Sequence, residues 1–389
     1  MKLSRTWLSA AAALMLAVPA TAHAKDYTVG LLLPYSGVYA ALGKEIDQGF
    51  ELALRTRLGE MAGSKIEIVR EDTEVKPPVG LAKTRKLILQ DQVDVMVGIV
   101  SSGVLGAIRD FVHQSGTPLI VANAGNDAAT GARCSKFITR VSFSNGQVNR
   151  PMGEWLFKKG IKKVYTLAPD YAAGHQMIET FSAAFKAAGG TIVGGEFTPF
   201  RTTKDFGPYL TKAKSAGPDA IFVFYAGGEA ISFVKQYASF GVADSVPLYG
   251  SGFLTSPLYV NAEGPAAKGV ITSLHYVPTI DSPQNAAFVK AFSEAYGHAP
   301  SEYAVQGYDA GQALVEAVKS GATDRAALAD ALGKVRFTSP RGPVEIDPAT
   351  NNIVQNIYIY ETVQGDGTLT QKILDVAKAV RDPVSGCQK

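Results

Sequence analysis

The amino-acid sequence predicts an α/β protein made of two doubly wound parallel-sheet lobes. Short apolar runs rich in Val, Ile, Phe and Tyr alternate with segments of helical period, which is typical of parallel sheets built from βαβ units. The order strand, loop, helix, strand, helix, strand occurs twice, from residue 27 to about 143 and from about 163 to 250. About 365 of the 389 residues follow a predicted leader, which exceeds the usual size of one domain.

Each predicted strand is a short apolar run bounded by turn residues or by a helical segment. In the first half the predicted strands are 27–34, 65–71, 93–100, 118–123 and 137–143. In the second half they are 163–169, 191–197, 219–225 and 247–250. The intervening helices carry apolar residues three or four apart, as in Val104, Ile108, Phe111 and Val112. Helices would therefore cover both faces of each sheet.

The loops after the first strand of each half correspond to one another. Residues 34–37 read Pro-Tyr-Ser-Gly, and residues 169–174 read Pro-Asp-Tyr-Ala-Ala-Gly. In doubly wound sheets a ligand binds at the carboxyl ends of the strands, and in a two-lobed protein those ends can face each other. The sequence therefore predicts a ligand site in a cleft between the lobes.

Residues 1–24 have the features of a secretory signal peptide. Lys2 and Arg5 precede an apolar run from Trp7 to Val18, and Ala22-His23-Ala24 forms a small-residue cleavage site. A membrane anchor is the alternative, but the run is shorter than the roughly 20 apolar residues that a spanning helix needs. No Cys follows the cleavage site to carry a lipid, so we expect an exported, soluble protein.

The charge of the mature sequence argues against nucleic acid or an anionic membrane as a partner. Without the leader, the sequence has 36 Lys and Arg residues and 35 Asp and Glu residues, a formal charge near +1.

The two cysteines, Cys134 and Cys387, are expected to form a disulfide because export places them in an oxidising compartment. Two unrelated thiols are the alternative.

Several segments, in their order and spacing, resemble one known family. They are VGLLLPYSG (29–37), VGIVSSG (97–103), VANAGND (121–127), APDYAAG (168–174), DAIFVFYAGG (219–228), YGSGFLTS (249–256), YAVQGYDAG (303–311) and SPRGPVEID (339–347). Over essentially all of the mature sequence, the chain is similar to the periplasmic leucine/isoleucine/valine-binding protein family. These are the type I solute-binding proteins of ABC importers.

The resemblance implies two lobes joined by a three-segment hinge, with crossings near residues 144, 274 and 348. Residues 25–144 and 275–347 would form the N-terminal lobe, and residues 145–274 and 348–389 the C-terminal lobe. It also implies a periplasmic protein that delivers a small-molecule carboxylate to an inner-membrane ABC permease complex. We expect a monomer without a cofactor.

In that family a hydroxyl group and backbone N–H groups in two first-lobe loops hold the ligand's carboxylate. The matching positions here are Ser101, Ser102, Ala122, Asn123, Ala124 and Gly125. The serines precede a predicted helix near Val104, and free N–H groups at a helix start form an anion site. The alternative is that Ser101 or Ser102 only caps this helix.

The second lobe would close over the ligand with residues that follow its strands. Tyr171, Tyr225 and Gly227 are the candidates, and Tyr39 is a further candidate in the first loop. A tyrosine at a strand end is often there for packing alone, because it buries a large apolar area. For Tyr39, the alternative is that its side chain lies on the surface of its lobe.

The loop 249–254 departs from the family pattern. Amino-acid binders place a carboxylate there to meet the ligand's ammonium group, whereas this loop contains Phe253 and no acid. A buried ammonium without a counter-charge costs several kcal/mol. The sequence therefore predicts an apolar, aromatic carboxylate as the ligand. Glu229 is the reservation, because it could turn inward; as an acid at a helix N-terminus it has an ordinary explanation.

Other functions are less consistent with the sequence. It contains no GxSxG elbow, P-loop or GxGxxG motif, and its histidines show no paired metal spacing, so we expect neither an enzyme nor a metal site. A branched-chain amino acid or an amide is the alternative ligand. A secreted hydrolase and a ligand sensor that docks on a membrane receptor are the alternative classes.

Overall fold

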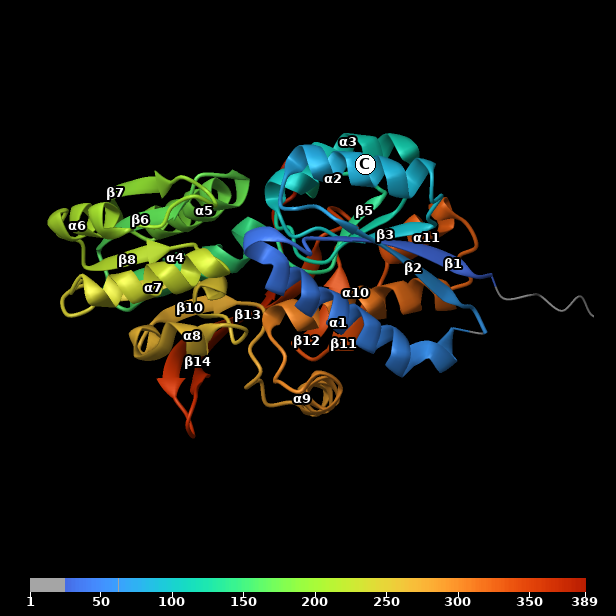
Figure 1. Cartoon of the computed structure of the whole chain (residues 1–389). Coiled ribbons are helices and arrows are strands. Elements are labelled where there is room, and N and C mark those ends of the chain that lie inside the picture. The colour runs from blue at the N-terminus through green and yellow to red at the C-terminus, as the bar shows by residue number, and fades with distance from the viewer. Residues whose placement is uncertain (1–24, 62) are drawn as a thin grey trace, which may run out of the picture.

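The computed structural model describes residues 25–61 and 63–389. The predicted signal peptide lies outside these residues. Figure 1 shows the α/β architecture as two lobes side by side: one contains β1 to β5 with α1 to α3 in blue to teal and α10 in orange, and the other contains β6 to β8 with α5 to α7 in green to yellow. Within the described ranges, no helix combines the length and the apolar character that crossing a membrane requires.

The first lobe contains a five-stranded sheet in which every pairing is parallel. The strand order is β2 (Ile66–Asp72), β1 (Tyr27–Leu33), β3 (Val95–Gly98), β4 (Leu119–Val121) and β5 (Ile138–Arg140). One face is covered by α2 (Pro77–Leu89) and α3 (Ser102–Ser115), and the other by α1 (Ala40–Arg57) and α10 (Glu302–Lys319) (Figure 1). Nearby lie α9 (Pro283–Tyr296) and α11 (Arg325–Leu332).

The helices α1 and α10 come from opposite ends of the chain and pack closely against each other. A Cβ atom on Gly49 would clash with the carbonyl of Ala304, and one on Gly307 would clash with the carbonyl of Ile46. Ser301 caps α10 by accepting hydrogen bonds from the N–H groups of Tyr303 and Ala304. This packing brings the start of α10 close to the loop after β4, where Gln306 accepts a hydrogen bond from Asn123.

A larger, mixed sheet forms the second lobe, and its last two antiparallel strands extend toward the first lobe (Figure 1). Its parallel part has the order β7 (Thr191–Thr198), β6 (Lys163–Pro169), β8 (Ala220–Val223), β9 (Leu248–Ser251) and β10 (Ile271–Leu274). Antiparallel strands continue it: β13 (Ile353–Gln364), β14 (Leu369–Val380), β12 (Gly342–Ile346) and β11 (Arg336–Ser339). The helices are α4 (Asn145–Lys158), α5 (Ala172–Ala187), α6 (Gly207–Ser215), α7 (Gly228–Ser239) and α8 (Val260–Glu263).

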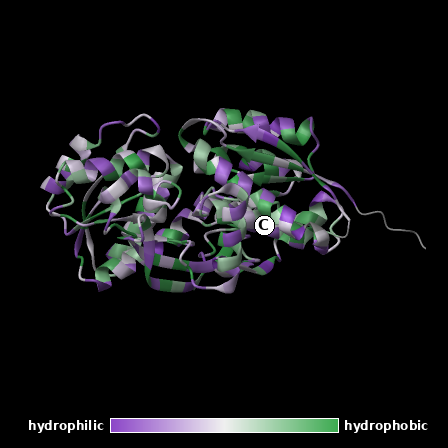
Figure 2. Ribbon diagram, turned by 60° about the horizontal axis from the view of Figure 1, so that its bottom comes forward, coloured by the Kyte–Doolittle hydropathy of each residue, from purple (hydrophilic) through white to green (hydrophobic). Residues whose placement is uncertain are grey.

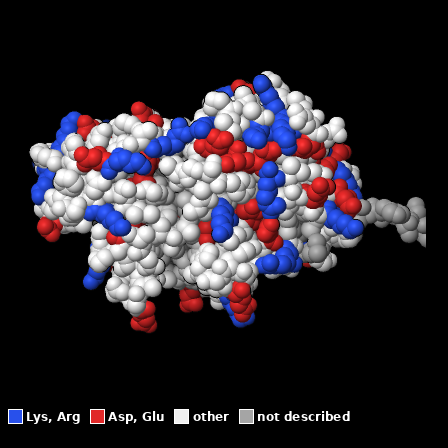
Figure 3. Space-filling model, in the orientation of Figure 1, with Lys and Arg blue, Asp and Glu red and all other residues white. Residues whose placement is uncertain are grey.

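The central strands form because their side chains are buried on both faces. Residues of β3, β4 and β8 are buried without exception, as expected for parallel strands covered by helices. Figure 2 shows the hydrophobic residues concentrated along the strands of the first sheet. Figure 3 shows Lys, Arg, Asp and Glu intermixed on the face that it displays.

The two cysteines are joined as predicted. Cys134 and Cys387 form a disulfide with their Cα atoms 5.4 Å apart. Cys134 lies just before β5 and Cys387 near the C-terminus, so the bridge holds the end of the chain against the first lobe.

Candidate functional site

A cavity lies where the carboxyl ends of strands from the two sheets face each other. Loops after β1, β3 and β4 supply one wall, and loops after β6, β8 and β9 supply the opposite wall. Its empty volume, including its opening, is about 300 Å³.

The polar end of the cavity is formed at the start of α3. Ser101 is the N-cap residue, and its carbonyl accepts the first helical hydrogen bond, from Leu105 N–H. The N–H groups before Leu105 therefore lie at a free helix N-terminus, where anions are stabilised. The side chain of Ser101 makes no capping hydrogen bond.

The hydroxyl of Ser102 is oriented by a residue that the sequence analysis did not identify. Asn145 Nδ2 donates to Ser102 Oγ at 3.2 Å and to Gln176 Oε1 at 2.7 Å. Because Ser102 Oγ accepts from Asn145, its own proton is free to be donated into the cavity. Gln176 Oε1 also accepts from Asp127 N–H at 3.0 Å, which fixes the orientation of both amides. Asn145 is thus a positioning residue for Ser102.

The loop after β4 completes the polar end. Asn123 Nδ2 donates to Gln306 Oε1 at 2.6 Å, and Gln306 Nε2 donates to His275 Nε2 at 3.2 Å. Burial and the nearby positive charge of Arg341 hold the pKa of His275 well below its usual range, so this histidine is neutral. A Cβ atom on Gly125 would clash with Asn145 and Phe143, so this position requires glycine.

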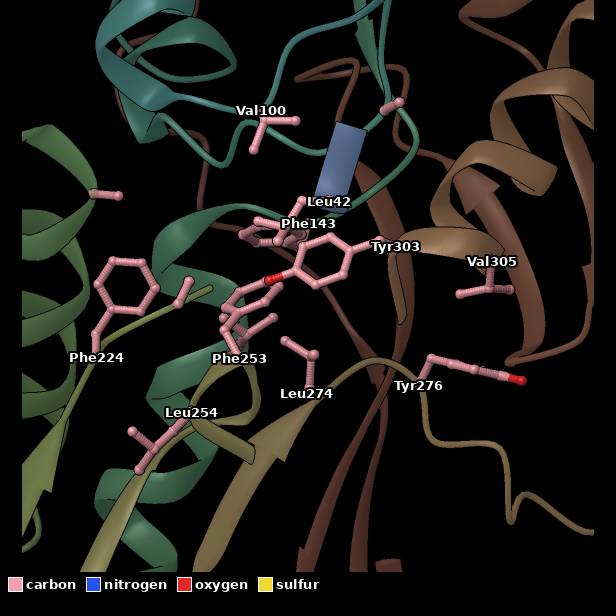
Figure 4. Packing of buried hydrophobic residues seen from close by; sticks show 14 of the residues in the cluster. Leu42, Val100, Phe143, Phe224, Phe253, Leu254, Leu274, Tyr276, Tyr303 and Val305 are labelled. Carbon is pink, nitrogen blue, oxygen red and sulfur yellow. The ribbon is translucent and has the colours of Figure 1, made fainter. Parts of the chain in front are cut away.

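Aromatic rings form the rest of the wall. The ring of Phe253 lies 5.1 Å from that of Phe143, 5.8 Å from that of Tyr303 and 6.1 Å from that of Phe224, measured between centroids. Figure 4 shows these side chains converging from different elements. Phe253 belongs to a short 3-10 helix after β9, Gly252–Thr255, and is 3% exposed. Such a wall suits a flat apolar ligand.

The two lobes touch around the cavity, so the structure is a closed form. Tyr39 Oη and Tyr171 Oη, which come from different lobes, share a hydrogen bond at 3.3 Å. Gln176 on α5 joins the lobes a second time through its bond from Asp127 N–H. A Cβ atom on Gly227 would lie 2.8 Å from the carbonyl of Val38, which shows a close approach of the two backbones there.

The residues that line the cavity in the described part of the chain are uncharged. Glu229, the acid that the sequence left in question, is buried, and its Oε1 accepts a hydrogen bond from Arg201 N–H at 2.8 Å. Burial raises the pKa of Glu229 to about 7. Burial raises the pKa of Tyr39 and of Tyr171, and the nearby charge of Glu229 adds to this, but Glu229 is not part of the cavity wall.

The structure brings together only some of the predicted site residues. Those that line the cavity are Tyr39, Ser102, Asn123, Gly125, Tyr171 and Phe253. Those that do not are Ser101, Ala122, Ala124, Tyr225 and Gly227. The N–H groups of Ala122 and Ala124 bond to the carbonyls of Gly98 and Ile99. Tyr225 turns away, shares a hydrogen bond with Thr198 Oγ1 at 3.2 Å and stacks on Phe233.

Several lining residues were not identified from the sequence. They are Leu42, Val100, Phe143, Asn145, Ala173, Met177, Phe224 and Tyr303. Tyr303 lies in the segment YAVQGYDAG, which contributed to the family resemblance without a role assigned to it. Asn145 is the first residue of α4, directly after the N-cap residue Ser144, and its sequence context did not indicate a role for its side chain in a binding site.

Comparisons with known proteins agree with this geometry. Residues 26–368 match the family model described as periplasmic binding protein. "Leu/Ile/Val-binding protein homolog 6" of Brucella melitensis biotype 1 is 31% identical over 385 residues, 97% of each chain.

Among solved structures, an R. palustris ABC-transporter solute-binding protein in complex with benzoate is 40% identical. The match covers 94% of this chain and 100% of that one, with a TM-score of 0.88. A solute-binding protein from Rhodopseudomonas palustris BisB5, in complex with 3,4-dihydroxybenzoic acid, is 36% identical over 92% of this chain and 99% of that one, also with a TM-score of 0.88.

Proposed function

This chain belongs to the periplasmic binding protein family, and from that premise we propose that it is the solute-binding protein of an ABC importer and captures a small aromatic carboxylate. The observation that carries the proposal is the make-up of the cavity. Hydrogen-bond donors gather at the end around Ser102, aromatic rings surround the other end, and the lining residues are uncharged.

The carboxylate would bind at the start of α3. The free helical N–H groups and the hydroxyl of Ser102 can donate to it without a Lys or Arg side chain. The ring would lie among Phe143, Phe224 and Phe253. Burying on the order of 150 Å² of apolar surface contributes about 4 kcal/mol at 25 cal/mol/Å².

An amino acid fits this cavity less well. Its ammonium group would be buried beside uncharged residues, and an unpaired buried charge costs several kcal/mol. Glu229, the acid that the sequence left in question, accepts a hydrogen bond from Arg201 N–H instead. The solved relative with bound benzoate supports an aromatic acid as the ligand.

An amide-bearing or amino-acid ligand is the second candidate, and one observation favours it. Asn145 Oδ1 is buried at the cavity and has no hydrogen-bond partner among the described residues. A ligand N–H group would satisfy this acceptor, and a carboxylate would not. The name of the Brucella relative is consistent with this alternative.

We further propose that the two lobes move as units about a hinge. Residues 25–144 and 275–347 would form one unit, supported by the packing of α10 on α1. Residues 145–274 and 348–389 would form the other, supported by the pairing of β13 with β10. Two residue pairs between β12 and β13, Glu345 with Val354 and Ile346 with Ile353, connect the units at the hinge. We propose that the protein acts as a periplasmic monomer and releases its ligand unchanged to a permease.

Calorimetry on refolded protein tests the ligand class, because refolding removes ligand that co-purifies. We expect benzoate to bind at least roughly 100-fold more tightly than leucine, a difference of about 2.7 kcal/mol. Submicromolar binding of leucine without binding of benzoate-type acids would refute the aromatic assignment. It would direct attention to Asn145 and Glu229 as partners of an ammonium group.

A further inference from the structure

The hydroxyl of Tyr303 is a polar group in the aromatic part of the cavity. Tyr303 is the second residue of α10 and is 1% exposed, and its ring lies 5.8 Å from the ring of Phe253. In Figure 4 its oxygen points away from α10 and lies between the rings of Phe143 and Phe253. The hydroxyl is therefore directed at the space that the ligand's ring would occupy.

This hydroxyl has no hydrogen-bond partner among the residues that the structure describes. The neighbouring phenols are already engaged. Tyr259 donates to the carbonyl of Phe253 and accepts from Gly227 N–H at 3.0 Å, and Tyr39 pairs with Tyr171. Burial raises the pKa of Tyr303 well above its usual range, and the nearby Tyr259 and Glu302 raise it further, but no polar atom of the described residues meets its hydroxyl in hydrogen-bonding geometry. Tyr303 is left with an unused donor and an unused acceptor.

A hydroxyl without a hydrogen-bond partner costs more free energy in a closed cavity than in an open cleft. In the open cleft, water can bond to it, but a ligand that fills the cavity removes that water. A ring without a polar substituent would leave the hydroxyl unpaired, whereas a ring hydroxyl would replace the lost bond. A site with a buried hydrogen-bonding group discriminates against ligands that lack the matching group.

We infer that the cavity selects an aromatic carboxylate that carries a ring hydroxyl, and that Tyr303 is the specificity-determining residue that binds this hydroxyl. The inference rests on the proposed function and adds a second polar contact, separate from the carboxylate donors around Ser102. The ligand would then be held by a polar group at each end, with Phe253 and Phe143 against its ring.

The test is calorimetry with benzoate and with 2-, 3- and 4-hydroxybenzoate, on the native protein and on Tyr303→Phe. The native protein should bind at least one hydroxybenzoate about 3- to 10-fold more tightly than benzoate, the effect of one neutral hydrogen bond. Tyr303→Phe should lose that preference and should bind benzoate as well as the native protein or better. Tyr296→Phe is the matched control, because the Tyr296 hydroxyl bonds to the carbonyl of Gln48 outside the cavity. It should keep the preference.

Two results would overturn the inference. One is a native protein that binds benzoate at least as tightly as every hydroxybenzoate. The other is a preference for a hydroxybenzoate that survives unchanged in Tyr303→Phe. Either result leaves the proposed capture of aromatic acids intact. If the native protein binds leucine and none of the four aromatic acids, the proposed function fails, and this inference fails with it.

Discussion

Replacing Ser102 with alanine should weaken ligand binding without unfolding the protein. The substitution removes the hydroxyl proton that we propose is donated to the ligand's carboxylate. A hydrogen bond to a charged group is worth about 1.5 to 3 kcal/mol, so the dissociation constant should rise about 10- to 150-fold. The fold should tolerate the change, because Asn145 Nδ2 loses its 3.2 Å bond to Ser102 but keeps its 2.7 Å bond to Gln176.

The adjacent serine supplies a matched control for this experiment. Ser101 is also buried and lies at the same helix start, but its side chain makes no capping bond and does not line the cavity. Ser101→Ala should therefore bind benzoate within about twofold of the native protein, because a substitution that removes no contact has little effect.

Calorimetric titration of each refolded variant with benzoate gives the comparison, and a thermal melt without ligand checks that both variants are folded. The reasoning would be refuted by an unchanged affinity in Ser102→Ala. It would equally be refuted if Ser101→Ala lost as much affinity as Ser102→Ala, since the effect would then belong to the helix start and not to one hydroxyl.

Two further predictions concern motion and pH. Saturating benzoate should reduce the radius of gyration measured by small-angle scattering, because contacts such as Tyr39 with Tyr171 form only when the lobes meet; an unchanged radius would count against hinge closure. Within the described part of the chain, neither carboxylate oxygen of the buried Glu263 has a hydrogen-bond partner, and burial raises its pKa to about 9 from an ordinary 4.5. Its contribution to stability is therefore complete below about pH 4.5 and is lost as the pH rises through 9. Glu263→Gln should therefore raise the melting temperature at pH 8 more than at pH 5, and an equal shift at both pH values would contradict this explanation.

Much of the fold could be predicted from the sequence because its signals are local. A parallel strand buried on both faces appears as a continuous apolar run, and β3, β6 and β8 all lie within such runs. The antiparallel strands that extend the second sheet were not predicted. In β14, only Gln371 is buried and charged residues such as Lys372 and Asp375 interrupt the run, so it lacks the apolar pattern of the other strands.

The site was harder to predict, because a cavity is formed by residues distant in the sequence. Phe253 and Tyr303 are 50 positions apart, and their rings meet only because the start of α10 packs beside the loop after β9. Asn145 and Ser102 are 43 positions apart, and their hydrogen bond joins the start of α4 to the start of α3. No spacing rule within one segment could have paired these residues.

The sequence by itself determined the two-lobed α/β class, the position of the cleft at the strand ends and the presence of Phe253 in a loop without an acid. The tertiary structure decided which side chains face the cleft. Phe224 and Tyr225 follow β8 directly, and the sequence favoured the tyrosine, but Phe224 lines the cavity and Tyr225 turns toward Thr198. Successive side chains on an extended chain point to opposite sides, and which side faces the cleft depends on the neighbouring strands and helices and not on the two residues themselves.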